Sequence, residues 1–204
     1  MALVSNTTLK AYLPEITGSG ADSELTKMIT RTESAIARYL GFPIADSGTS
    51  PVLDEATYTV HLDGPMYGHP DVLILSLKPV VTVASVHSDP NLVYGSDTEI
   101  TSSEYILDKA NGRLILKPQT ATSSFDRGYR NIKVVMNAGY SAANPPEDLV
   151  QAICVWCSQL QRNKATQGKD QITQRNQTIK ISPKTMPTEV RTLLDPFRNP
   201  FVIL

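Results

Sequence analysis

Cysteine is scarce in this sequence, with two residues among 204. They lie three positions apart, at Cys154 and Cys157, so neither a disulfide framework nor secretion is indicated. Long apolar runs are also missing, and none approaches the roughly 20 residues that a membrane-spanning helix needs. The amino terminus lacks the basic start and apolar core of a secretory signal. These absences predict a soluble protein that is made in a reducing cytoplasm and has no membrane partner.

Net charge is nearly absent too, because 19 Lys and Arg are balanced by 20 Asp and Glu. This balance argues against a strong overall attraction to nucleic acid or anionic membrane. The charge is uneven, however. Residues 161–204 carry eight basic and three acidic side chains, a net +5, whereas residues 1–160 carry eleven and seventeen, a net −6. The asymmetry predicts a basic carboxy-terminal arm with a partner of its own.

Two segments have the apolar periodicity of amphipathic helices. Residues 22–40 carry a single apolar stripe and are followed by Gly41, which suits the left-handed stop of a helix. Residues 146–163 have a wider apolar arc than a surface helix needs. This arc predicts a central helix, packed on two sides, with Ile153 and Trp156 in the core.

Between these helices the apolar period changes to strict alternation, which is typical of strands with one buried face. Strands are predicted at 58–62, 73–77, 81–86, 105–107, 114–116 and 132–136. Asn111-Gly112 lies between the fourth and fifth of these and is a strong hairpin signal. Because no helix separates the strands, the sequence predicts an α+β fold: a small helical bundle with an inserted antiparallel β-sheet or small barrel.

The carboxy-terminal part is expected to be an extended arm. The polar segment 163–187 cannot bury much, and we interpret it as mobile or as ordered only on a partner. A short helix should start at Pro187, and the chain ends on an apolar tail that is a liability in water. The expected domains are a helical core at 1–56 plus 138–165, an inserted β domain at 57–137, and an arm with short helix and tail at 166–204.

Candidate catalytic and metal-binding residues are few. Three His-x-Asp pairs could each hold a metal or act as an acid–base couple, since residues two apart share one face of a strand. They are His61/Asp63, His69/Asp71 and His87/Asp89. Because they lie at strand ends, where Asp stabilises turns, we favour turn hydrogen bonding.

Two other motifs also have simpler explanations. Cys154-Val155-Trp156-Cys157 has the spacing of a redox pair, but it lies within the predicted helix and not at its start, so core thiols are favoured. Gly18-Ser19-Gly20 lacks the Lys-Ser/Thr of a phosphate-binding loop and reads as a hinge. We therefore predict no catalytic residue, no metal site and no cofactor.

The order of elements carries a resemblance that no single motif carries. The relevant stretches are Tyr39-Leu40-Gly41-Phe42, residues 73–80, residues 131–140, Pro146-Glu147-Asp148-Leu149 and the ending Leu193-Leu194-Asp195-Pro196-Phe197-Arg198. In this order they resemble the head–tail connector, or adaptor, proteins of long-tailed bacteriophages and prophages. The resemblance covers nearly the whole chain.

This resemblance implies a structural virion protein of the neck between capsid and tail, made in the cytoplasm of the bacterial host, and not an enzyme. Members of the family form a ring, twelve-fold in the virion, that binds under the portal protein. They extend the DNA channel, through which DNA passes without sequence recognition, and offer a platform to the stopper or tail-completion protein. An alternative remains open, in which the β insertion is a host- or glycan-binding module on a helical mount.

The carboxy-terminal residues 187–204 are the expected portal-binding region, because they combine basic charge with aromatic and apolar groups that dominate protein interfaces. The candidate residues are Val190, Leu194, Pro196, Phe197, Arg198, Phe201 and Leu204. The alternative is that this segment folds back on the chain's own helices, as termini of small domains often do.

Overall fold

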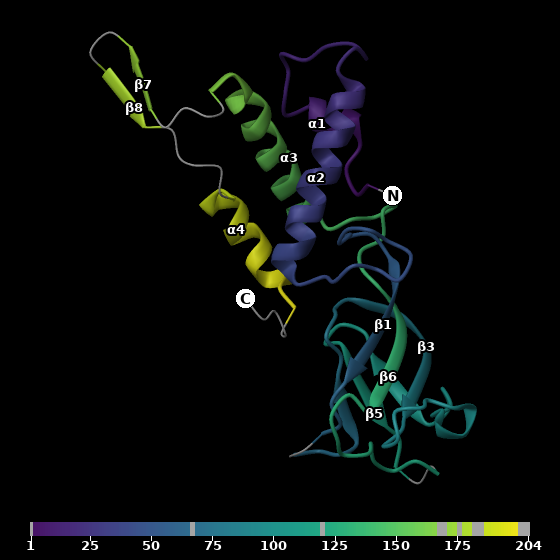
Figure 1. Cartoon of the computed structure of the whole chain (residues 1–204). Coiled ribbons are helices and arrows are strands. Elements are labelled where there is room, and N and C mark those ends of the chain that lie inside the picture. The colour runs from purple at the N-terminus through teal and green to yellow at the C-terminus, as the bar shows by residue number, and fades with distance from the viewer. Residues whose placement is uncertain are drawn as a thin grey trace.

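The computed structural model describes residues 2–65, 68–118, 121–166, 171–174, 177–180 and 186–199. Helices gather at one end of the molecule and two β-sheets at the other (Figure 1). The two sheets are inserted between the second and third helices of the chain. This arrangement confirms the predicted α+β fold.

The helical part contains α1 (Asn6–Lys10), α2 (Asp22–Leu40), α3 (Glu147–Arg162) and α4 (Thr188–Leu194). The stop of α2 is the one that its sequence predicts. Gly41 has φ 86° in the left-handed region, and the last turn is closed by backbone N–H groups that donate to the carbonyls of Ala37 and Arg38. No helix in the described part of the chain is long and apolar enough to cross a membrane.

Helix α3 lies between α2 and α4 and also contacts α1 (Figure 1). Ile153, Cys154 and Cys157 are fully buried, and both thiols are free, as expected of core residues. Trp156 is only partly buried, so its placement in the core was wrong. The apolar arc of α3 is wider than the surface that its neighbouring helices cover.

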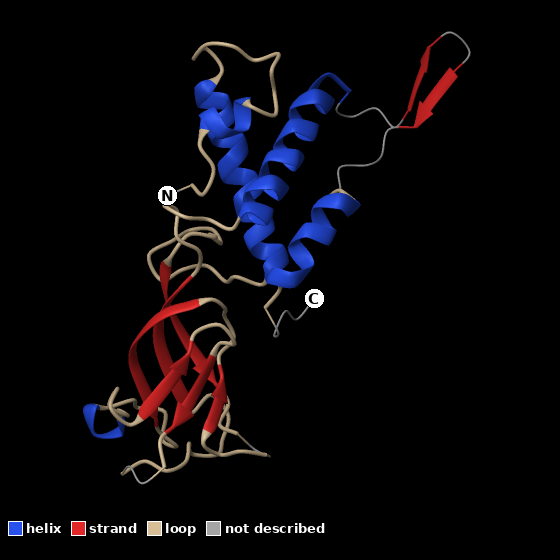
Figure 2. Ribbon diagram, turned by 180° about the vertical axis from the view of Figure 1, so that it is seen from behind, coloured by secondary structure: helices blue, strands red, loops and turns tan. Residues whose placement is uncertain are grey.

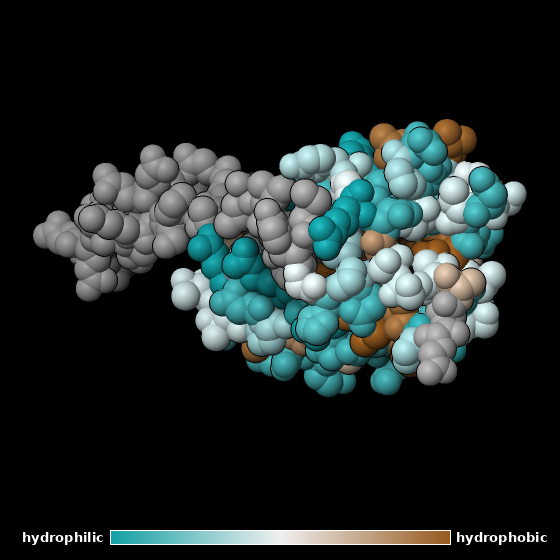
Figure 3. Space-filling view, turned by 90° about the horizontal axis from the view of Figure 1, so that it is seen from below, coloured by the Kyte–Doolittle hydropathy of each residue, from teal (hydrophilic) through white to brown (hydrophobic). Residues whose placement is uncertain are grey.

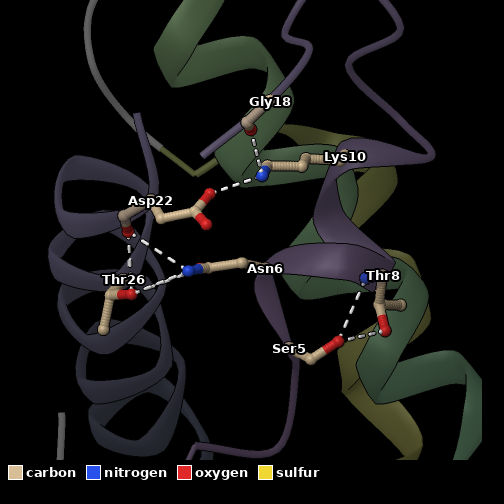
Figure 4. A network of polar contacts seen from close by, with 7 residues as sticks. All are labelled: Ser5, Asn6, Thr8, Lys10, Gly18, Asp22 and Thr26. Carbon is tan, nitrogen blue, oxygen red and sulfur yellow. Dashed lines mark hydrogen bonds and ion pairs between the residues drawn. The ribbon is translucent and has the colours of Figure 1, made fainter. Parts of the chain in front are cut away.

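Side chains of α1 attach to the start of α2 (Figure 4). The Asn6 amide donates to the carbonyl of Asp22 at 3.2 Å and to Thr26 Oγ1 at 3.0 Å. Lys10 Nζ lies 2.5 Å from Asp22 Oδ1 and donates to the Gly18 carbonyl at 2.6 Å. The glycine-containing loop is thus held from within the chain through the Gly18 carbonyl.

The β part consists of two three-stranded antiparallel sheets (Figure 2). The first has the order β1 (Ala56–Leu62), β6 (Ile132–Ala138), β3 (Val80–Ser88). The second has the order β2 (Val72–Ile74), β5 (Arg113–Leu116), β4 (Tyr105–Asp108). The predicted antiparallel pairing is confirmed. Neither sheet closes on itself, so the insertion is a pair of open sheets and not the small barrel that was the other possibility.

The arm contains a hairpin that the sequence pattern did not predict. β7 (Gln171–Gln174) pairs antiparallel with β8 (Gln177–Lys180), and Figures 1 and 2 show the pair apart from the helices. The pattern indicated no strands within 163–187, which we interpreted as mobile or as ordered only on a partner. Polar composition disfavours burial, but it does not prevent a local backbone ladder. Residues 167–170, 175–176 and 181–185 of this segment lie outside the described residues.

A buried carboxyl fixes the amino-terminal segment to α2. Glu33 is 8% exposed, and its Oε1 accepts hydrogen bonds from the N–H groups of Leu3 at 2.8 Å and Val4 at 3.2 Å. Burial raises the pKa of Glu33 to about 7, although the two N–H donors act in the opposite direction. The native state thus holds a proton on Glu33 at pH values where the unfolded chain has lost it.

We expect Glu33→Gln to remove part of the pH dependence of stability. Between pH 4.5 and 7 the folded protein binds one more proton at Glu33 than the unfolded chain, so the free energy of unfolding falls as pH rises. The decrease should amount to about 3 kcal/mol, since one pKa unit corresponds to about 1.4 kcal/mol. Urea denaturation at several pH values measures it. The exposed control Glu55→Gln should keep the wild-type slope, and an unchanged slope in Glu33→Gln would contradict the assignment.

Candidate partner-binding surface

The carboxy-terminal segment 186–199 folds back along α3. Val190 and Leu194 on α4 are fully buried, and α4 contacts α3 along its length. A 3-10 turn at Asp195–Phe197 then carries the chain toward the end of α2. Residues 186–199 thus fold back on the chain's own helices, which is the alternative that the sequence analysis left open.

Four aromatic rings join this segment to the β insertion. The Phe197 ring lies 5.9 Å from that of Tyr140 in an edge-to-face contact, and Tyr140 lies 6.2 Å from Phe42. Phe42 in turn lies 6.4 Å from Tyr58 on β1. These centroid distances are within the range of favourable aromatic pairs. The row therefore connects the carboxy-terminal segment, the chain after β6, the end of α2 and the first sheet.

Asn199 closes the same joint with polar contacts. Its side chain is buried, its N–H donates to the Leu40 carbonyl at 3.0 Å, and its Oδ1 accepts from the Lys78 N–H at 2.8 Å. Leu40 is the last residue of α2, and Lys78 lies between β2 and β3. One residue, through its backbone N–H and its side chain, thus ties the carboxy-terminal segment to both the helices and the β insertion.

The chain leaves β6 through a glycine that this joint requires. Gly139 has φ 123°, and a Cβ atom placed there would lie 2.6 Å from the Asp54 carbonyl oxygen. Its N–H donates to the Pro79 carbonyl, and the next N–H, of Tyr140, donates to the Leu53 carbonyl. This close approach brings Tyr140 into the aromatic row.

The surface of the segment carries an oriented arginine. The guanidinium of Arg198 lies 5.2 Å from the centre of the Tyr39 ring, a cation–π geometry. The Tyr39 hydroxyl donates to Asp195 Oδ1 at 2.8 Å. Partial burial and the Asp195 carboxylate raise the pKa of Tyr39, so the hydroxyl remains a donor. Arg198 is therefore held in place while still reachable by a partner.

The predicted binding residues fall into three groups. Val190 and Leu194 are buried against the chain's own helices and leave no surface to a partner. Pro196 is exposed, and Phe197 and Arg198 are partly exposed. Phe201 and Leu204 lie outside the described residues. Sequence reasoning missed Asn199, Tyr39 and Tyr140, because nothing in the local pattern marks them as members of one site.

Of the His-x-Asp pairs, His87/Asp89 forms the turn that the sequence argument favoured, whereas His69 Nδ1 lies 3.8 Å from Asp71 Oδ1 and Asp63 has a distant partner. Asp89 accepts N–H bonds from Asn91, Val93 and Tyr94 at 2.7–2.9 Å, and those hydrogen bonds lower the pKa of Asp89. Asp63 accepts from the Arg130 N–H at 2.8 Å. Among the described residues, no group of three or more His, Cys, Asp or Glu is arranged to hold a metal ion.

A family model for head completion proteins matches residues 2–200. The chain belongs to the head completion protein family. This confirms the resemblance to head–tail connectors that the order of elements predicted. Comparison of the head completion protein with curated sequences finds no match.

Solved structures support the fold of this head completion protein. It resembles a chain in the neck of an empty gene transfer agent particle computed with C6 symmetry, with 17% identity, a TM-score of 0.55 and coverage of 95% of this chain and 88% of that chain. It also resembles a chain in the neck of the native particle computed with C12 symmetry, with 17% identity, a TM-score of 0.53 and coverage of 94% of this chain and 87% of that chain. A chain in the virion of the native gene transfer agent particle has 17% identity, a TM-score of 0.53 and coverage of 90% of this chain and 80% of that chain. At this identity the likeness concerns the fold.

We expect Asn199→Ala to destabilise the head completion protein by about 1–3 kcal/mol, because it removes the acceptor of a largely buried Lys78 N–H. Chemical denaturation measures the loss. Arg191→Ala, on the exposed face of α4, is the control and should stay within about 0.5 kcal/mol of the wild type. Equal effects of the two substitutions would show that Asn199 does not hold the joint.

Proposed function

We propose that this head completion protein is a ring-forming head–tail connector of a virion neck. The observation that carries the proposal is the family match over residues 2–200. The fold, shared with chains of particle necks over more than nine-tenths of this chain, supports it. Those necks were computed with C6 and C12 symmetry, which favours a cyclic homo-oligomer, twelve-fold in the virion, for this chain as well.

In this role the ring binds under the portal protein and lengthens the channel through which DNA passes. The near-neutral chain suits a channel that DNA crosses without sequence recognition, since strong net attraction would retard it. The face of the ring opposite the portal offers a platform to the stopper or tail-completion protein. The protein acts in the virion neck after synthesis in the bacterial host.

The portal-binding region is the surface of the carboxy-terminal segment together with the last residues of the chain. Asn199 and Phe197 fix the point at which residues 200–204 leave the joint. Arg198 is pre-positioned on Tyr39, so little side-chain entropy is lost when it binds a carboxylate of the partner. Aromatic and arginine side chains supply much of the binding energy at interfaces. Phe201 and Leu204 complete the proposed set, and Val190 and Leu194 act by holding α4.

Deletion of residues 200–204 tests the portal role. The cut leaves the Asn199 and Phe197 contacts intact, so the melting temperature should stay near that of the full chain. Binding to purified portal, measured by biolayer interferometry, should weaken at least tenfold. A deletion from residue 196 is unsuitable, because it also removes the joint.

Arg198→Ala should likewise weaken portal binding, whereas Arg127→Ala, an exposed arginine of the β insertion, should not. A truncated protein that binds portal at full strength, or one that unfolds, would reject the docking role. A head completion protein missing from purified particles would reject the connector function itself.

A further inference from the structure

The two sheets differ in the chemistry of their outward faces. On the first sheet, β1 and β6 turn inward with residues such as Tyr58, Val134 and Met136. The opposite, outward positions of these two strands are Thr57, Thr59, His61, Lys133, Val135 and Asn137. Five of these six are polar, and the ring of Tyr94, from the loop after β3, lies over His61 and Lys133 on this face.

The second sheet breaks this pattern. Its inward positions are Leu73, Leu107, Leu114 and Leu116. Its outward positions are Val72, Ile74, Ile106, Asp108, Arg113 and Ile115. Four of these six are β-branched apolar side chains, and Ile74 and Ile106 are 46% and 54% exposed. A sheet that is apolar on both faces is one that another surface covers.

This outward face is not flat. A hollow of about 480 Å³ opens between it and the preceding loop. The sheet contributes Val72, Leu73, Ile74 and Arg113 to the lining, and the loop contributes Pro65 with the polar Asp63 and His69. The surface thus has an apolar floor, a charged rim and the size to receive one or two protruding side chains.

A protruding apolar loop lies elsewhere on the same insertion, after β3. Leu92 is 51% exposed and Val93 is 77% exposed. The carboxylate of Asp89, itself 3% exposed, accepts backbone N–H bonds from Val93 and its neighbours. Figure 3, which views the molecule from below, shows apolar side chains at the surface of this end. The loop therefore presents its apolar side chains on a rigid backbone and loses little entropy when it binds.

The backbone of this loop is also strained. Leu92 has φ 62° and Tyr94 has φ 56°, a left-handed conformation that Gly or Asn adopts at lower cost. Strain of this kind persists where the surroundings impose it and is concentrated at functional positions. A leucine kept at such a position retains an exposed apolar side chain at the expense of stability.

We propose that the hollowed face of the β2–β5–β4 sheet is the surface on which the Leu92–Val93 loop of a neighbouring copy of this chain docks. A closed ring requires each subunit to offer two different, complementary surfaces, and a hollow and a rigid protrusion are such a pair. Arg113 lines the hollow together with Asp63 and His69, and exposed Asp97 and Glu99 follow the loop, so docking would place an acidic side chain within reach of Arg113. The inference rests on the proposed ring and names its lateral contact.

A cysteine pair tests this contact in assembled particles. The variant Val93→Cys with Ile74→Cys places one thiol on each surface, and the natural cysteines are buried, with pKa values that burial raises to about 12 and 11. Mild oxidation should give a ladder of covalent oligomers on a non-reducing gel. The control Val93→Cys with Val135→Cys, on the polar face of the first sheet, should give monomers.

A variant chain that is present in particles but gives no ladder, or only internal cross-links, overturns the contact and leaves the connector function standing. Absence of the chain from particles overturns both. A second variant guards against misfolding: Leu92→Asn suits the left-handed backbone and should keep the melting temperature, yet reduce ring assembly at least tenfold. The double variant Leu92→Asn with Ile106→Thr changes both surfaces, and unchanged ring assembly of this variant also overturns the proposal. The matched control Val135→Thr, on the first sheet, should assemble as the wild type does.

Discussion

The hydrogen bonds of the buried Asn199 link the helices to the β insertion. Its backbone N–H donates to the last carbonyl of α2, and its side-chain Oδ1 accepts from the N–H of Lys78, two groups that would otherwise lose hydrogen bonds on burial. The rings of Tyr58, Phe42, Tyr140 and Phe197 fill the space beside it. Helices, β insertion and carboxy-terminal segment are therefore in direct contact at one joint.

Local pattern predicted the elements because the physics behind them is local. The apolar stripe of 22–40 and the glycine after it determine α2 without reference to the remainder of the chain. Asn199 could not be found in this way, because its partner Lys78 is 121 positions distant. Val190 and Leu194 show the same limit: an apolar residue looks alike in sequence whether the chain's own α3 or another protein covers it.

The second sheet carried a signal that alternation alone does not capture. Residues 72–75 and 114–116 are continuous runs of Val, Leu and Ile, and runs of this kind are typical of strands covered on both faces. Counting only every second residue hides that property. The outward positions of β1 and β6 in the first sheet are instead mostly polar, with threonines and a lysine among them. The outward face of the β2–β5–β4 sheet is therefore more apolar than the corresponding face of the other sheet in the same molecule, as expected of a surface that a partner covers.

The buried Glu33 has a consequence for a particle outside its host. A protein whose carboxylates are all stabilised in the folded state weakens as its surroundings become acidic. Here the carboxyl beneath the amino-terminal segment has its pKa raised to about 7, so mild acid relieves a buried charge. Mild acidification therefore adds to the stability of the helical end of the subunit, an effect opposite in sign to that of a carboxyl with a lowered pKa such as Asp89.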